Sequence, residues 1–216
     1  DRLLRPACAG ALVCAHPVGG RFGQMLSMVN GGSAFRWAAE LAGWQGLSAD
    51  ELDRRLAETP AGCAGLRFEP LLAEGGGPGC GRRGRLLGLS LAHGPGHLLR
   101  ASVEGLACEL ARHLRALEAG GLRPRRLVMC GGAAGGRVTP QVVADATGLP
   151  VCCRAESAMS ALGAAVLARG LIEPTPLNEV LARPAGGSAR ELRPGADAPL
   201  YAQMAGEYFD RVQSRE

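Results

Sequence analysis

Residues 125–169 constrain the fold more than any other part of the chain. They predict a strand at 125–130, a helix near 138–147, a short strand at 150–153 and a helix near 157–169, joined by short links. Strands that alternate with helices in this way form a parallel sheet with helices packed against it. The segment therefore predicts an α/β fold.

The remaining segments supply further strands and helices. The patterns predict strands at 11–15, 22–29 and 66–72 and helices at 34–44, 48–58, 94–119 and 198–213. Ser33 is the expected N-cap of the first helix, and Ser48 with Glu51 makes a capping-box pattern before the second. Residues 73–85 read as a Gly- and Pro-rich loop. Residues 173–200 read as peripheral.

Composition excludes several classes of protein. The chain has 216 residues, of which 47% are hydrophobic and 20% are charged, as in a globular protein with a sizeable core. No run of 18 apolar residues occurs, so we expect no membrane span. The net charge of the chain is +4. Its arginines cluster only at 81–85 and 123–126, and neither cluster has aromatic neighbours. We therefore expect no nucleic-acid partner.

The eight cysteines do not form a metal-binding pattern. None lies in a CxxC pair, and no His spacing completes a zinc motif. Cys108 and Cys130 fall in apolar helix and strand patterns, where Cys acts as a small hydrophobic residue. We predict reduced thiols in a cytoplasmic protein, and we assign no metal ligands.

Two glycine-rich turns each lie between a strand and a helix. One is CGGAAGG at 130–136 and the other is NGGS at 30–33. Such turns present backbone N–H groups with no Cβ in the way, and a helix N-terminus follows, which suits a nucleotide phosphate. The alternative is that both turns serve helix–strand packing alone. Packing alone also explains Gly163 in the last helix of the α/β segment.

The other polar candidates have structural interpretations. His93 and His97 are expected to be cap or surface groups, because no third metal ligand lies near them in the sequence. Asp145 is expected to serve packing or solvation. Glu104 and Glu109 are expected on the solvated face of the long helix, with burial near the cleft as the alternative.

Four segments together resemble the C-terminal half of the FGGY carbohydrate kinases. They are MLSMVNGGSAFRW, RGRLLGLSLAHGPGHLLRASVEGLACELARHL, LVMCGGAAGGRVTPQVVADATGLPV and ESAMSALGAAVLA. Their order and spacing carry the resemblance, which covers the chain to about residue 171. The xylulose-kinase-like branch fits best, on GSAFRW and LAHGPGHLLRASVEG.

The resemblance implies a ribonuclease-H-like domain of the actin and sugar-kinase type, a mixed sheet flanked by helices. Residues 1–171 would be the C-terminal kinase domain, and residues 172–216 a peripheral loop and C-terminal helix. In the family the nucleotide, ATP with Mg²⁺, lies against the glycine turns. The implied ATP-binding residues are Gly131, Gly132 and Ala133 at the phosphates, Gly32 and Arg36 beside the nucleotide, and Gly136 near the adenosine.

The resemblance also implies what this chain lacks. The family's catalytic Asp and its Gly-Thr phosphate turn align upstream of Asp1, as do the first strand and the sugar-binding N-terminal domain, so we assign no catalytic residue. The expected function is ATP-dependent phosphorylation of a sugar or polyol hydroxyl, with this chain supplying the nucleotide-binding half. The alternative is a degenerate, non-catalytic module that binds a nucleotide or a partner. The free half is expected to self-associate, for example as a homodimer.

Overall fold

A computed structural model of the chain describes residues 5–28, 30–72, 83–154, 158–173, 175–182 and 189–214. Its elements, in chain order, are β1 (Leu12–Ala15), β2 (Phe22–Met25), α1 (Gly32–Leu41), α2 (Ala49–Glu58), a 3-10 turn (Cys63–Gly65), β3 (Arg67–Glu69), β4 (Arg85–Leu87), α3 (Pro95–Ala119), β5 (Leu127–Cys130), α4 (Gly132–Gly135), α5 (Val138–Thr147), β6 (Val151–Arg154), α6 (Met159–Ile172), α7 (Leu177–Ala182), β7 (Ala189–Leu192) and α8 (Ala198–Gln213). Most of the loop predicted at 73–85 lies outside these residues.

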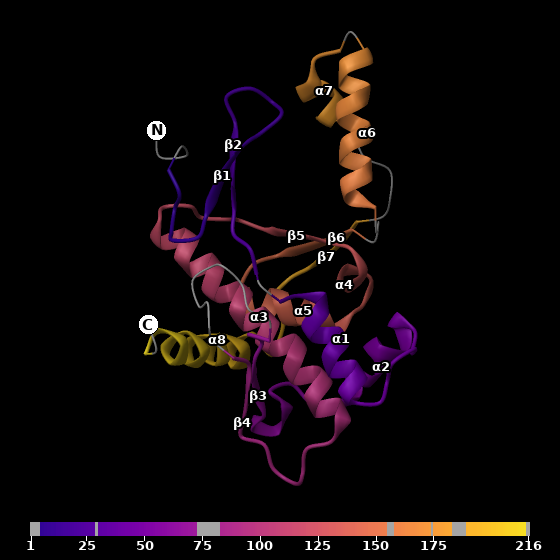
Figure 1. The fold of residues 1–216 in the computed structure, drawn as a ribbon, viewed down its shortest axis with the longest axis vertical. Coiled ribbons are helices and arrows are strands. Elements are labelled where there is room, and N and C mark those ends of the chain that lie inside the picture. The colour runs from indigo at the N-terminus through magenta and orange to yellow at the C-terminus, as the bar shows by residue number, and fades with distance from the viewer. Residues whose placement is uncertain are drawn as a thin grey trace.

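Within the described residues, the strands form three small, separate sheets. β1 and β2 form an antiparallel hairpin, and β3 pairs antiparallel with β4. β5 and β6 are parallel, as the sequence predicts, and β7 adds to β6 in the antiparallel direction. The predicted mixed α/β architecture is therefore confirmed, with β5 at one edge of its sheet (Figure 1).

The long helix α3 is the centre of the molecule. It crosses the body diagonally and is packed by α1, α5, α8 and β3 (Figure 1). Leu99, Val103 and Ala107 are among its buried side chains. At its start, the N–H of Gly94 donates to Nδ1 of His97, so His97 is a cap group as predicted.

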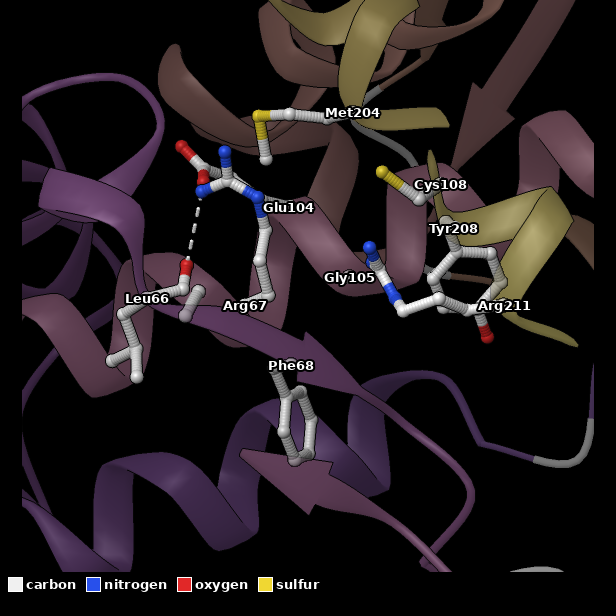
Figure 2. A pocket seen from close by; sticks show the side chains of 10 residues that line it. Leu66, Arg67, Phe68, Glu104, Gly105, Cys108, Met204, Tyr208 and Arg211 are labelled. Carbon is white, nitrogen blue, oxygen red and sulfur yellow. Dashed lines mark hydrogen bonds between the residues drawn. The ribbon is translucent and has the colours of Figure 1, made fainter. Parts of the chain in front are cut away.

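β3 approaches α3 so closely that only glycine fits at the crossing. A Cβ placed on Gly105 would lie 2.1 Å from the carbonyl oxygen of Phe68. Figure 2 shows this junction, where side chains of β3, α3 and α8 line a cavity of about 10 Å³. The lining residues that it shows include Phe68, Glu104, Cys108, Met204 and Tyr208.

The C-terminal helix α8 is part of the core. Met204, Tyr208 and Val212 form an apolar stripe on this helix and are buried against α3 and α5. The segment expected to be peripheral, 173–200, includes β7, which pairs with β6. The domain boundary near residue 171 stays a prediction.

The expectation of solvent exposure is wrong for two carboxylates on α3, because α8 helps to bury both. Glu104 is 1% exposed and Glu109 is 6% exposed, although both were expected to face solvent. Glu104 accepts hydrogen bonds from Arg100 and Tyr201, and Glu109 accepts two from Arg112. Charged groups are tolerated in an interior when they are paired in this way.

Two helix predictions fail in detail. α1 begins at Gly32 with Gly31 as its N-cap and no side-chain cap, so Ser33 lies inside the first turn. α6 has no buried residue, and a Cβ on Gly163 would meet nothing within 4 Å, so its small residues do not serve close packing here. By contrast, Ser48 does cap α2, accepting from the N–H of Glu51 at 3.2 Å.

None of the helices in the described part of the chain is both long and apolar enough to span a bilayer.

Candidate functional site

One cavity brings the two predicted glycine turns together. Its volume is about 800 Å³, within the usual range for ligand pockets. α1 and α2 form one wall, and α3, α4 and α5 contribute the rest. Its lining is mostly apolar, including Phe35, Trp44 and Met129, with polar groups from Arg36 and Thr139. A mostly apolar cavity with a few polar groups is typical of a small-molecule site.

Five of the six predicted ATP-binding residues line this cavity. They are Gly32, Arg36, Gly132, Ala133 and Gly136. Gly131 is not among the lining residues, but it directly precedes Gly132 as the N-cap of α4. The structure thus places turns that are about 100 residues apart in the sequence on one cavity.

The first turn leaves its backbone open at the start of α1. A Cβ on Gly31 or Gly32 would meet no atom within 4 Å. Arg36 lies one turn later on the same helix and is exposed, and no acidic residue lies in the first turn of α1. This end of the cavity therefore combines bare backbone with a positive charge.

The second turn is built for close approach to its backbone. Gly131 has φ of +81°, a conformation that side chains other than glycine rarely adopt. A Cβ on Gly131 or Gly132 would also meet nothing within 4 Å. Within the described residues, the N–H groups of Gly132 and Ala133 have no protein acceptor. These donors are available to a ligand.

Asp53 on α2 is a cavity residue that the sequence analysis missed. Its carboxylate accepts hydrogen bonds from the N–H of Arg137, at 2.9 and 3.0 Å, and from the N–H of Val138, at 3.0 Å. The first amides of α5 are thus satisfied by the protein's own carboxylate. The N-terminus of α5 is therefore not free to bind a phosphate. The backbone N–H groups of residues 131–133 are the donors of this turn that a phosphate could use.

The described residues contain no group of three or more His, Cys, Asp or Glu side chains that could hold a metal ion. The polar groups of the cavity include backbone N–H donors, the guanidinium of Arg36 and the carboxylates of Glu40 and Asp53, and its walls are mostly apolar, so its chemistry is that of binding and positioning. Phosphoryl transfer relies on such positioning and on charge neutralisation more than on covalent chemistry by the protein.

Comparison with known proteins identifies the family of the chain. The family model described as "FGGY family of carbohydrate kinases, C-terminal domain" matches residues 7–169. The chain belongs to the FGGY family. This FGGY domain is 31% identical over 190 residues to a xylulose kinase of Klebsiella pneumoniae, covering 82% of this chain and 38% of that protein. It is 35% identical over 140 residues to a glycerol kinase of a Geobacter species, covering 63% of this chain and 28% of that protein.

Solved structures agree with this assignment. The xylulose kinase of Rhodospirillum rubrum superposes on the FGGY domain with a TM-score of 0.73 and 28% identity, over 95% of this chain and 41% of that one. The glycerol kinase of Plasmodium falciparum, solved with ADP, shares the fold. Its TM-score is 0.68 at 20% identity, over 89% of this chain and 38% of that one. The predicted sugar-kinase type of fold is confirmed. The chain spans two fifths or less of the length of the curated relatives given above.

Proposed function

We propose that this FGGY domain binds the nucleotide in an ATP-dependent kinase that phosphorylates a sugar or polyol hydroxyl. The observation that carries the proposal is the single cavity lined by both glycine turns. Family membership supplies the reaction class, and the xylulose kinase resemblance favours a xylulokinase-like enzyme.

The cavity residues fit ATP in a definite direction. The amides of Gly132 and Ala133, the open backbone at Gly32 and the guanidinium of Arg36 suit the phosphates. The apolar wall around Phe35 and Trp44 suits the nucleoside. The Asp53 carboxylate lies beside Gly136 and repels phosphate, so the adenosine is expected at that end.

Mg²⁺ belongs to the proposal as the ion that accompanies ATP. Mg²⁺ in kinase sites is held largely by phosphate oxygens and water, with one or two carboxylates. In this domain, the ion's role would be to neutralise phosphate charge during transfer.

The rest of the enzyme is proposed to come from a longer protein. A catalytic carboxylate and the sugar-binding surface would lie in an N-terminal domain, and the protein would work in the cytoplasm. The described cysteines are free thiols, in keeping with a reducing compartment. Alone, this domain is expected to bind ATP without transferring its phosphate.

Isothermal calorimetry of the domain with ATP, ADP and adenosine tests the proposal. We expect saturable binding, and we expect Arg36→Ala to weaken ATP more than adenosine, because the side chain acts on phosphate. Gly163→Ala on α6 is the control, since Gly163 does not line the cavity and a Cβ there meets nothing within 4 Å. Absence of saturable nucleotide binding would overturn the proposal and leave the packing-only interpretation of the turns.

Turnover assays separate the kinase from a degenerate module. The full-length protein with ATP, Mg²⁺ and a panel of ketoses and polyols should release ADP in a sugar-dependent way. The isolated domain should give none. Sugar phosphorylation by the isolated domain would contradict the proposal that the catalytic carboxylate and the sugar-binding surface lie in another domain. Nucleotide binding by the full-length protein without turnover on any sugar would favour the module.

A further inference from the structure

We infer that Asp53 is a positioning residue for the nucleotide cavity, and that Gly136 is glycine in order to admit its carboxylate. The inference rests on the proposed function, because it concerns the shape of the same cavity. Both residues line that cavity, Asp53 from α2 and Gly136 from the turn between α4 and α5.

The first step is the geometry of the contact. A Cβ placed on Gly136 would lie 2.7 Å from Oδ1 of Asp53 and 3.2 Å from its carboxyl carbon. Separations under 3 Å do not occur between such atoms in real structures, so one of the two groups would have to move. The carboxylate therefore takes the space that any side chain at position 136 needs.

The second step is that the backbone does not require glycine at this position. Gly136 has φ of −71° and ψ of 173°, an extended conformation that any residue adopts. The neighbouring Gly131, with φ of +81°, is different, because its conformation itself favours glycine. Space is thus the reason for glycine at 136.

The third step is that Asp53 is not free to swing away. Its two oxygens accept three backbone hydrogen bonds, of 2.9 to 3.0 Å, from the N–H groups of Arg137 and Val138. A carboxylate at the N-terminal end of α5 also interacts favourably with the helix dipole. Rotation of the side chain would forfeit these interactions.

The same peptide is held from its other side. The carbonyl oxygen of Gly136 accepts a hydrogen bond from the guanidinium of Arg190 on β7, while the N–H of Arg137 donates to Asp53. The Gly136–Arg137 peptide is therefore fixed at both its polar atoms by side chains distant in the sequence. Asp53 thereby sets the position of α2, one wall of the cavity, relative to the glycine turn.

Binding measurements on single and double variants test this role. We expect Gly136→Ala to weaken ATP about tenfold, since small displacements of positioning groups have effects of this order or larger. Asp53→Ala should weaken ATP similarly, and Asp53→Asn less, because the amide keeps one oxygen acceptor. Asp53→Ala with Gly136→Ala should be no weaker than Asp53→Ala alone, because the clash is gone. Each Kd is measured well below the variant's unfolding temperature, so that a loss of stability alone does not change it.

Two control variants lie off the cavity. Gly163→Ala on α6 adds a Cβ that meets no atom within 4 Å, and Asp50→Ala removes an exposed carboxylate from α2; neither residue lines the cavity. Both should bind ATP like the wild type.

The outcomes distinguish this inference from the proposed function. If the wild type does not bind ATP, the proposed function fails. If the wild type binds ATP but Gly136→Ala binds it equally tightly, the positioning role of Asp53 is refuted while the proposed function stands. The same conclusion follows if the Kd of the double variant rises by the product of the two single fold-increases.

Discussion

The hydroxyl of Tyr201 donates a 2.7 Å hydrogen bond to the carboxylate of Glu104, which lies 97 residues earlier in the chain. The same oxygen of Glu104 accepts from the N–H of Gly62, and Arg100 donates to the Tyr201 oxygen at 2.8 Å. Burial, with the nearby Glu104 carboxylate, raises the pKa of the Tyr201 phenol and keeps it protonated. This cluster joins α8 to α3 and to the turn before β3.

Tyr201→Phe should lower the free energy of unfolding by about 1–3 kcal/mol, because it removes one donor from a buried carboxylate. Urea denaturation measures the difference. Gln203→Ala on the same helix is the control, since its side chain is exposed and it should change stability by less than about 0.5 kcal/mol. Equal stability of Tyr201→Phe and the wild type would show that the hydrogen bond contributes nothing net.

Replacing Glu109 with Gln should lower the free energy of unfolding, and the loss should be largest near neutral pH. Burial alone would raise the pKa of Glu109, but the Arg112 guanidinium prevails and holds it below its ordinary 4.5. A carboxyl with a lowered folded-state pKa stabilises the fold above its unfolded pKa and loses that contribution as the pH falls through the folded value. The wild type should therefore exceed Glu109→Gln by roughly 1–3 kcal/mol near neutral pH, and the gap should narrow progressively below pH 4.5.

Denaturation across the acidic range measures this narrowing. His113 also faces Glu109, and burial lowers the pKa of its imidazole below the ordinary 6.5, so its charge also changes on the acidic side of that value. The comparison is therefore repeated in a His113→Gln background, where the narrowing should persist. A gap that stays constant down to strongly acidic pH would contradict the stabilising role of the ionised carboxylate.

The cysteines should divide sharply in reactivity towards an alkylating reagent. Burial raises the pKa of Cys108 to about 12, and burial with the neighbouring Glu104 raises that of Cys63. The thiolate is the reactive form, so both should stay unmodified near neutral pH until the protein unfolds. Cys14 and Cys130 are exposed and should react in the folded protein. Mass spectrometry of peptides reads each site, and rapid labelling of folded Cys108 would count against the packing of α8 on α3.

The free domain should self-associate through α6. Leu171 and Ile172 are 89% and 84% exposed, and adjacent exposed apolar side chains favour association. Changing both to Glu should shift the protein towards monomer in sedimentation velocity. Leu91→Glu is the control, because Leu91 is fully exposed and precedes α3, outside α6. A wild type that remains monomeric at high concentration would sink this prediction.

Strong periodicity allowed the helices to be predicted from sequence, but not their partners. The predicted bounds of α5 and α8 agree with the structure, and those of α3 differ by one residue. An amphipathic stripe shows that a face is buried without showing what covers it. Glu104 and Glu109 were misjudged for this reason, since the helix that buries them lies far downstream.

The two glycine turns could be predicted because a glycine-rich turn between a strand and a helix is a local sequence pattern. Asp53 could not, because its partners are backbone N–H groups more than 80 residues away, and any sequence supplies such groups. The only local signal was its place on α2 beside Leu52 and Leu56, which pack against the core. A carboxylate on such a face could suggest an unseen donor but could not identify it.

The position of α8 also has a consequence for synthesis. Because its side chains complete the covering of α3, the domain cannot finish folding on the ribosome until residues 198–213 have left the exit tunnel. Until then the Arg100–Glu104 pair lacks its tyrosine. A premature stop codon shortly before this helix would therefore leave all of the residues that match the family, 7–169, in a polypeptide whose long helix lacks its cover.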